Sequence, residues 1–155
     1  MAGPTVGTVA PEFELPKSGG GSLKLSDLGG SPVVLFFYPK DDTSACTAEA
    51  IDFSTLQPEF EHAGAIVVGV SPDSQKKHDK FKAKYNLTVD LLSDEDKIVL
   101  QAYGVWGEKT LYGRKYMGVI RTTFLIGPDG RILGVWPQVR VKGHAAEVLE
   151  AVRAL

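Results

Sequence analysis

The stretch of residues 33–50, VVLFFYPKDDTSACTAEA, constrains the fold of this chain more than any other. Its first six residues are apolar at every position, which is typical of a strand buried on both faces. Pro39 ends this strand, because proline has no amide hydrogen to donate to a neighbouring strand. A polar loop of residues 40–44 follows, and the chain's only cysteine, Cys46, then opens a run of good helix formers. The stretch therefore predicts a central strand, a loop, and a helix whose first turn carries a thiol.

The predicted position of Cys46 favours a reactive thiolate. Backbone N–H groups in a first helical turn lack partners within the helix and carry positive partial charge. Thr43 adds a hydroxyl that can hydrogen-bond the sulfur or an oxygen beside it, and the ring of Pro39 can form one wall of a pocket. A lone cysteine is more often a small buried apolar side chain. The polar flanks of Cys46 and its place at a strand-to-helix junction favour a functional role instead.

The string FFYPKDDTSACTAEA closely resembles the active-site segment of peroxiredoxins, with the bacterioferritin comigratory protein or peroxiredoxin Q group as the nearest branch. Similar segments follow along nearly the whole chain, among them VGTVAPEFELP, VVGVSPDS, LLSDEDKIVLQAYGVWGEK and IRTTFLIGPDGRI. The resemblance implies that Cys46 is the peroxidatic cysteine and that Pro39 and Thr43 stand at active-site positions. It also implies that Arg121 is the active-site arginine. On the residues alone, Arg121 would be a surface side chain at the start of a strand.

The chain departs from the group that it resembles in its cysteines. Many members carry a resolving cysteine five residues after the peroxidatic one, where this chain has Ile51. Others carry one in the following helix, about where Lys82 and Ala83 lie. A chain with one thiol cannot form an internal disulfide, so we expect one-cysteine behaviour in which an external thiol regenerates Cys46.

The resemblance implies a thiol-dependent antioxidant peroxidase that reduces hydrogen peroxide and alkyl hydroperoxides through a sulfenic acid at Cys46. Thioredoxin, glutaredoxin or glutathione would supply the regenerating thiol. The alternative is a redox-sensing or thiol-relay binding domain that uses Cys46 without significant turnover. We expect His62, His78 and His144 on surface helices or at their ends. This disfavours a cysteine hydrolase, because that class needs a histidine base beside its thiol.

The order of the expected elements indicates an α/β fold in a single domain, residues 1–155, with a mixed central sheet and helices on both faces. An N-terminal β-hairpin of residues 12–15 and 22–25 precedes the main strand. The resemblance implies that this is the thioredoxin-like fold. The other expected strands are residues 65–70, 89–92, 121–126 and 131–136, and the other expected helices are residues 74–85 and 143–155.

Pro58 is the residue that most limits the helix after Cys46. A proline inside a helix costs about 3 kcal/mol or more, because it removes a hydrogen bond and its ring meets the preceding turn. We therefore expect a break near residues 56–57, with Pro58 opening a second short helix that ends at His62.

Two further segments carry specific predictions. Ser93 and Asp96 are expected to form a capping box at the start of a helix, with Ser93 as the N-cap residue. Residues 101–118, rich in glycine and aromatic residues, are expected to form a loop and an irregular hairpin. Trp106 and Tyr112 could line a pocket mouth there, and packing within the loop explains them equally well.

Composition and charge limit the kinds of partner that we expect this chain to bind. The net charge of −2 and the pI of about 5.9 do not suggest a nucleic-acid ligand. The longest apolar runs are shorter than the roughly 20 residues that a membrane-spanning helix needs, and we expect no membrane association. We see no metal-ligand spacing and no dinucleotide fingerprint, and we expect no cofactor and no metal. The start lacks a signal-peptide pattern, so we expect a cytoplasmic protein that is a monomer or a weak homodimer.

Overall fold

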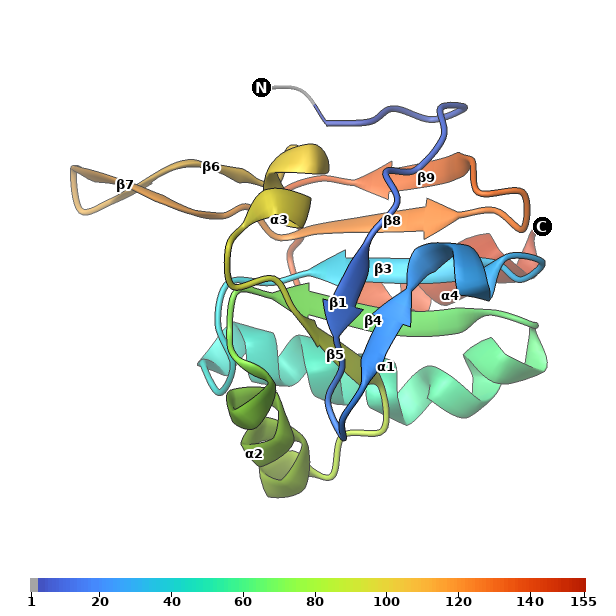
Figure 1. Ribbon diagram of the computed structural model, residues 1–155, viewed down its shortest axis with the longest axis horizontal. Helices are drawn as coiled ribbons and strands as arrows, with labels where there is room; N and C mark the ends of the chain where they lie inside the picture. The colour runs from blue at the N-terminus through green and yellow to red at the C-terminus, as the bar shows by residue number, and fades with distance from the viewer. Residues whose placement is uncertain (1–2) are drawn as a thin grey trace.

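A five-stranded mixed sheet lies at the centre of the computed structural model, which describes residues 3–155 (Figure 1). Its strands run in the order β5-β4-β3-β8-β9. The bounds are Val33–Phe37 for β3, Ile66–Ser71 for β4, Asp90–Ser93 for β5, Thr122–Ile126 for β8 and Ile132–Trp136 for β9. Strands β3, β4 and β5 are parallel, whereas β8 and β9 are antiparallel to their neighbours. The expected mixed α/β sheet is confirmed, with the apolar strand β3 at its centre.

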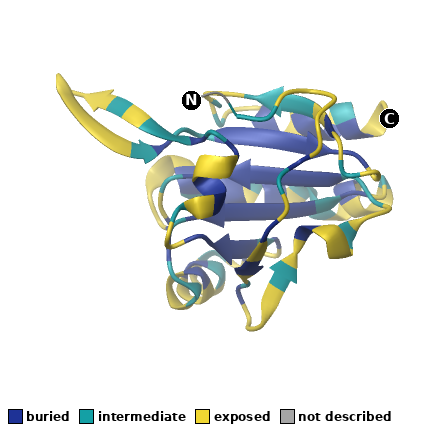
Figure 2. Ribbon diagram, turned by 45° about the horizontal axis from the view of Figure 1, so that its top comes forward, coloured by how far each residue is buried: buried dark blue, intermediate teal, exposed yellow. Residues whose placement is uncertain are grey.

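Helices cover both faces of this sheet (Figure 1). The bounds are Ser44–His62 for α1, Gln75–Tyr85 for α2, Ile98–Ala102 for α3 and His144–Arg153 for α4. One core lies between the sheet and helices α1, α2 and α4, and includes Phe36 and Phe53, whose rings stack 4.5 Å apart. The other core lies under α3 and the N-terminal segment, and includes Phe37 and Tyr103. The central strands are therefore buried on both sides (Figure 2).

Two hairpins stand outside the central sheet. Strands β1 (Glu14–Pro16) and β2 (Ser22–Lys24) form the N-terminal hairpin, which confirms that prediction. Strands β6 (Trp106–Leu111) and β7 (Arg114–Val119) pair along six residues and project from the body of the molecule (Figure 1). We expected an irregular hairpin here, but this one is regular. Tyr112 and Gly113, both with positive φ, form its two-residue turn.

The predicted break in the helix at Pro58 is wrong, because α1 runs through it without interruption. Proline removes the N–H that would otherwise bond the carbonyl of Ser54, four residues earlier. The hydroxyl of Thr88, on the chain between α2 and β5, lies 3.4 Å from that carbonyl oxygen and also contacts the side-chain oxygen of Gln57, and the Thr88 N–H donates to the Ser54 hydroxyl at 3.1 Å. Thr88, 34 positions after Ser54, thus replaces part of the hydrogen bonding that the helix loses at Pro58.

The predicted capping box is also wrong. Ser93 is the last residue of β5, and α3 begins only at Ile98. Two carboxylates serve the start of this short helix instead. Asp94 accepts a hydrogen bond from the N–H of Leu100 at 2.7 Å, and Asp96 accepts one from the N–H of Ile98 at 3.1 Å. The acidic residues do mark a helix start, but the helix begins five residues after Ser93.

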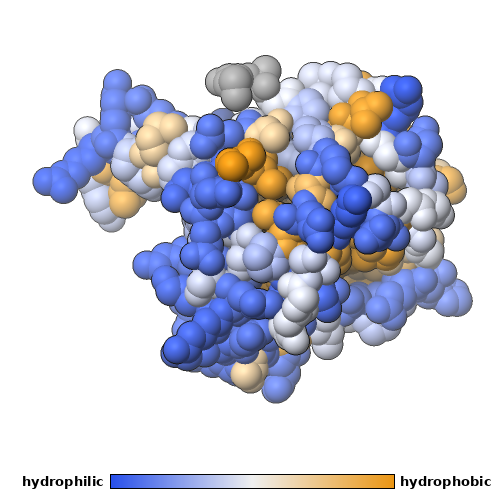
Figure 3. Space-filling model, in the orientation of Figure 1, coloured by the Kyte–Doolittle hydropathy of each residue, from blue (hydrophilic) through white to orange (hydrophobic). Residues whose placement is uncertain are grey.

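The surface over α2 and over most of the outer hairpin is hydrophilic (Figure 3). On α2 the lysines face outward, while Phe81 is buried against the sheet. Within residues 3–155, no helix combines the length and the apolar character needed to cross a membrane.

Candidate active site

Cys46 lies in the first turn of α1, as its sequence context predicts. Thr43 is the N-cap residue with extended backbone angles, so Cys46 is the third residue of the helix. The loop before it continues directly from the carboxyl end of β3. The side chain is 1% exposed and packs against the aromatic core beneath α1, but a charged group also reaches the sulfur.

That charged group is Arg121. It immediately precedes β8, whose first residue, Thr122, lies opposite Phe37 at the end of β3. This pairing brings Arg121 next to Cys46 although 75 positions separate them, and Nη2 donates to the Cys46 sulfur at 3.3 Å. Burial lowers the pKa of Arg121, but the charges of Glu49 and Cys46 outweigh that effect and raise it. The guanidinium therefore keeps its positive charge beside the sulfur.

Glu49 completes the contacts of this guanidinium, and we did not identify it from the sequence. Arg121 Nη1 donates to Oε1 of Glu49 at 2.7 Å. The side chain is 1% exposed, and Oε2 has no hydrogen-bond partner among residues 3–155. Burial raises the pKa of Glu49 to about 7, although the charge of Arg121 opposes the shift. The available signal was its spacing, because a residue three positions after Cys46 faces the same side of the helix.

Thr43 and Pro39 frame the loop before Cys46. The hydroxyl of Thr43 donates to the carbonyl oxygen of Lys40 at 2.8 Å, so in this structure its proton is directed at the loop and not at the sulfur. Its oxygen lone pairs stay available, because a hydroxyl accepts as well as donates. Pro39 is half-buried where the chain leaves β3.

Lys109 brings a second cation to the site from the hairpin. The aliphatic part of the Lys109 side chain lies over Gly118, where a Cβ added to the glycine would come within 3.1 Å of Lys109 Cδ. Its Nζ then donates to the carbonyl oxygen of Val119 at 2.9 Å. Burial and the like charge of Arg121 lower the pKa of Lys109, while the charge of Cys46 acts in the opposite direction. Lys109 thus belongs to the same electrostatic neighbourhood as the sulfur.

The expectation that all three histidines lie at the surface is wrong for two of them. His62 is exposed, but His78 and His144 are buried. His78 bonds Asp41 and a backbone carbonyl, and His144 lies 2.8 Å from the hydroxyl of Thr123. Each histidine is buried because distant elements supply polar partners for its ring, which helix periodicity cannot reveal. Within residues 3–155 neither histidine hydrogen-bonds Cys46, so the arrangement does not resemble a hydrolase.

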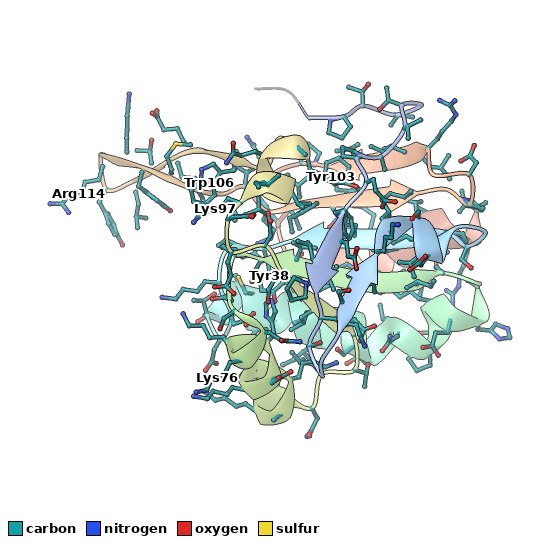
Figure 4. The ribbon with its side chains drawn as sticks, in the orientation of Figure 1. Tyr38, Lys76, Lys97, Tyr103, Trp106 and Arg114 are labelled. Atoms are coloured by element: carbon teal, nitrogen blue, oxygen red, sulfur yellow. The ribbon has the colours of Figure 1, made fainter. Side chains whose placement is uncertain are left out.

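Trp106 and Tyr112 lie at opposite ends of the hairpin, with Trp106 at its base (Figure 4). Trp106 packs against the core at the base, with the ammonium of Lys97 5.4 Å from its ring centroid. Tyr112 is 95% exposed in the turn at the far end. In residues 3–155 we find no group of three or more His, Cys, Asp or Glu side chains that could hold a metal ion.

The sequence is similar to known proteins over nearly its whole length. Residues 6–135 match the model of the AhpC/TSA family. The chain is 51% identical over 144 residues to a putative peroxiredoxin bcp from Coxiella burnetii, covering 93% of this chain and 95% of that protein. It is 46% identical over 148 residues to peroxiredoxin Bcp from Bacillus subtilis, covering 96% and 94%.

Solved structures give the same result. The fold is similar to a mutant of PrxQ from Xylella fastidiosa, with a TM-score of 0.94, 42% identity, and coverage of 99% of this chain and 98% of that one. It is also similar to the Xanthomonas campestris bacterioferritin comigratory protein, with a TM-score of 0.90, 41% identity and the same coverage. The thioredoxin-like fold of the peroxiredoxins is thereby confirmed. The chain therefore belongs to the AhpC/TSA family, within the Bcp/peroxiredoxin Q group of peroxiredoxins.

Proposed function

We propose that Cys46 is the nucleophile with which this thiol-dependent peroxidase attacks its peroxide, and that Arg121 stabilises both the thiolate and the transition state. The observation that carries the proposal is the contact between the Arg121 guanidinium and the Cys46 sulfur at 3.3 Å, made in the first turn of a helix. A cation and a helix start both favour the ionised sulfur over the thiol.

The chemistry follows from these groups. The sulfur attacks the terminal oxygen of the peroxide, an S–O bond forms, and the O–O bond breaks, so that sulfur is oxidised to a sulfenic acid and the peroxide is reduced. Negative charge moves from sulfur to the leaving oxygen during this step. Arg121 and the N–H groups of the first turn of α1 are fixed where they can stabilise that moving charge.

Thr43 and Pro39 have supporting roles in this proposal. The hydroxyl of Thr43 can exchange its bond to the Lys40 carbonyl for a bond to the peroxide, and its lone pairs can accept the peroxide's own hydrogen. Pro39 lacks an N–H, so it can border the peroxide without competing for its hydrogen bonds. Hydrogen peroxide and alkyl hydroperoxides are the proposed substrates. The X. campestris relative, described for its alkyl peroxide reduction activity, supports the second class.

Regeneration of Cys46 requires an external thiol, because the chain holds one cysteine. Ile51 is partly exposed on α1, and Lys82 and Ala83 lie in α2, so the positions of both alternative resolving cysteines are occupied by other residues. We propose thioredoxin, glutaredoxin or glutathione as the reductant. We also propose a cytoplasmic location, since a reducing compartment suits a single free thiol, and a monomer or weak homodimer.

The test is the consumption of peroxide in a single turnover. Wild type should consume one peroxide per thiol, and Cys46→Ser should consume none. Steady-state assays with thioredoxin, glutaredoxin and glutathione in turn then identify the reductant. Equal peroxide consumption by wild type and the variant would refute the role of Cys46. Peroxide consumption without turnover on any reductant would support the alternative of a redox sensor, which the peroxiredoxin relatives do not favour.

A further inference from the structure

The active site contains two acids but one guanidinium between them. Arg121 donates through Nη2 to the Cys46 sulfur at 3.3 Å and through Nη1 to Oε1 of Glu49 at 2.7 Å. The other oxygen of Glu49, Oε2, is buried and has no hydrogen-bond partner among residues 3–155. A buried carboxylate oxygen without a partner is unfavourable, and a protonated carboxyl is far less so. The surroundings of the Glu49 carboxyl group thus favour its protonated form.

The charges of these three side chains lead to the same conclusion. If Cys46 and Glu49 share one proton, the group has no net charge, whichever acid is ionised. If both acids are ionised, two buried negative charges must share the one guanidinium that hydrogen-bonds them. Burial raises the pKa of Glu49 to about 7, so Glu49 is suited to keep the proton while the sulfur is a thiolate.

Other charged groups near Glu49 do not take over this role. Asp52 lies three residues after Glu49 on α1 and raises the pKa of Glu49 through its like charge. Lys109, from β6, interacts electrostatically with Arg121 and Cys46, and its Nζ donates to the Val119 carbonyl. On α4, burial and the charge of Arg121 lower the pKa of His144 to about 4, so this histidine is a poor proton acceptor near neutral pH.

We propose that Glu49 is the proton carrier of the reaction, taking the proton of the Cys46 thiol and giving it to the oxygen that leaves. This inference rests on the peroxidase function proposed above. When the thiolate attacks, the hydroperoxide's hydrogen stays on the new S–OH group, and the O–O bond electrons leave with the second oxygen. Glu49 donates its proton to that oxygen, which departs as an alcohol or water. Glu49 is then a carboxylate paired with Arg121.

The cycle closes when an external thiol reduces the sulfenic acid. The first thiol forms a mixed disulfide and releases water, and a second thiol releases Cys46 with a proton on its sulfur. That proton returns to Glu49. The oxidation of sulfur is balanced by the reduction of the peroxide, and the oxidation of the external thiols by the reduction of the sulfenic acid.

The test compares Glu49→Gln with wild type across a pH series and across leaving groups. Wild type should react more slowly with an alkyl hydroperoxide as the pH rises above about 7, because Glu49 loses its proton there. Glu49→Gln should lack this decrease and should be slower by about 100-fold near neutral pH, a typical loss for a missing proton donor. With peracetic acid the loss should nearly disappear, because acetate leaves without needing a proton.

Glu61→Gln is the matched control, since it removes an exposed carboxylate from the same helix without touching Arg121 or Glu49, and it should behave as wild type. Glu49→Asp keeps an acid and should retain the decrease at alkaline pH. Glu49→Ala, which also lacks the acid, replaces Glu49→Gln in the comparison if that variant does not fold. An equal loss with the alkyl hydroperoxide and with peracetic acid would overturn the proposal, because Glu49 would then only position Arg121. Unchanged rates in Glu49→Gln would overturn it as well. If wild type itself consumed no peroxide, the proposed function would fail instead.

Discussion

The imidazole of His78 and the carboxylate of Asp41 lie 2.6 Å apart, Nδ1 to Oδ2, at a point where both side chains are buried. The other ring nitrogen of His78 faces the carbonyl oxygen of Leu92 at 2.9 Å, which can only accept, so that nitrogen carries a hydrogen. Tyr38 donates to the second oxygen of Asp41 at 2.7 Å. His78 belongs to α2 and Asp41 to the loop that leads to Cys46, so this contact holds the loop against α2.

We predict that His78→Phe weakens this hold. The variant leaves Asp41 buried with the Tyr38 hydroxyl but without the imidazole, and removing one side of a buried pair typically costs about 3–5 kcal/mol. The free energy of unfolding, measured by urea titration, should fall by that amount, and the rate of peroxide reduction should fall with it as the loop loosens. His62→Phe is the control, because His62 is exposed on α1. Equal stability of the two variants would show that the buried pair does not hold the loop.

We predict that Arg121→Met lowers the second-order rate constant for peroxide by about 100- to 1000-fold, the usual effect of removing a donor fixed beside developing charge. Arg121→Lys should recover only part of the rate, since an ammonium cannot serve Cys46 and Glu49 with the planar geometry of a guanidinium. Arg114→Met, at the exposed tip of the hairpin, should leave the rate unchanged. A rate for Arg121→Met within a few-fold of wild type would contradict the role proposed for this residue.

We predict that Lys109→Met slows the reaction of Cys46 with iodoacetamide. Lys109 is a second cation in the neighbourhood of the sulfur, so its removal should make negative charge on the sulfur less favourable. The measurement is the rate of alkylation by iodoacetamide. Lys115→Met, which removes an exposed lysine from the same hairpin, provides the comparison. If both variants react at the same rate, Lys109 serves only to hold the Val119 carbonyl.

We predict that His144 makes the fold less stable in acid. Burial and the charge of Arg121 lower its pKa to about 4, below the usual value for histidine. Between about pH 6.5 and 4 the unfolded chain therefore binds a proton at His144 that the folded chain does not, and stability falls as the pH falls through this window. Relative to His144→Gln, wild type should lose about 1–2 kcal/mol of unfolding free energy between about pH 7 and 5. Urea titrations at the two pH values test this, and parallel losses would contradict it.

Local sequence patterns predicted what local interactions decide. The apolar run of β3 predicted a central strand, and Pro39 followed by helix formers placed Cys46 in a first turn. Arg121 could not be connected to Cys46 in this way, because strand pairing between β3 and β8 joins them; only the resemblance indicated it. Glu49 was within reach of simple helical spacing and was missed.

The wrong predictions share a physical cause. Pro58 stays within α1, where Thr88, far along the chain, places its hydroxyl between the side chain of Gln57 and the carbonyl that the proline leaves free. His78 is buried because Asp41 and the Leu92 carbonyl come from two other elements. In each case a tertiary partner satisfies a group that the local sequence leaves unsatisfied, and one-dimensional patterns hold no record of that partner.

The single buried thiol has a kinetic consequence. Without a second cysteine in the chain, an oxidised molecule waits for a collision with a reductant, and the mean waiting time is inversely proportional to the reductant's concentration. The fraction of molecules found oxidised at any moment then reflects the ratio of peroxide supply to thiol supply in the surroundings.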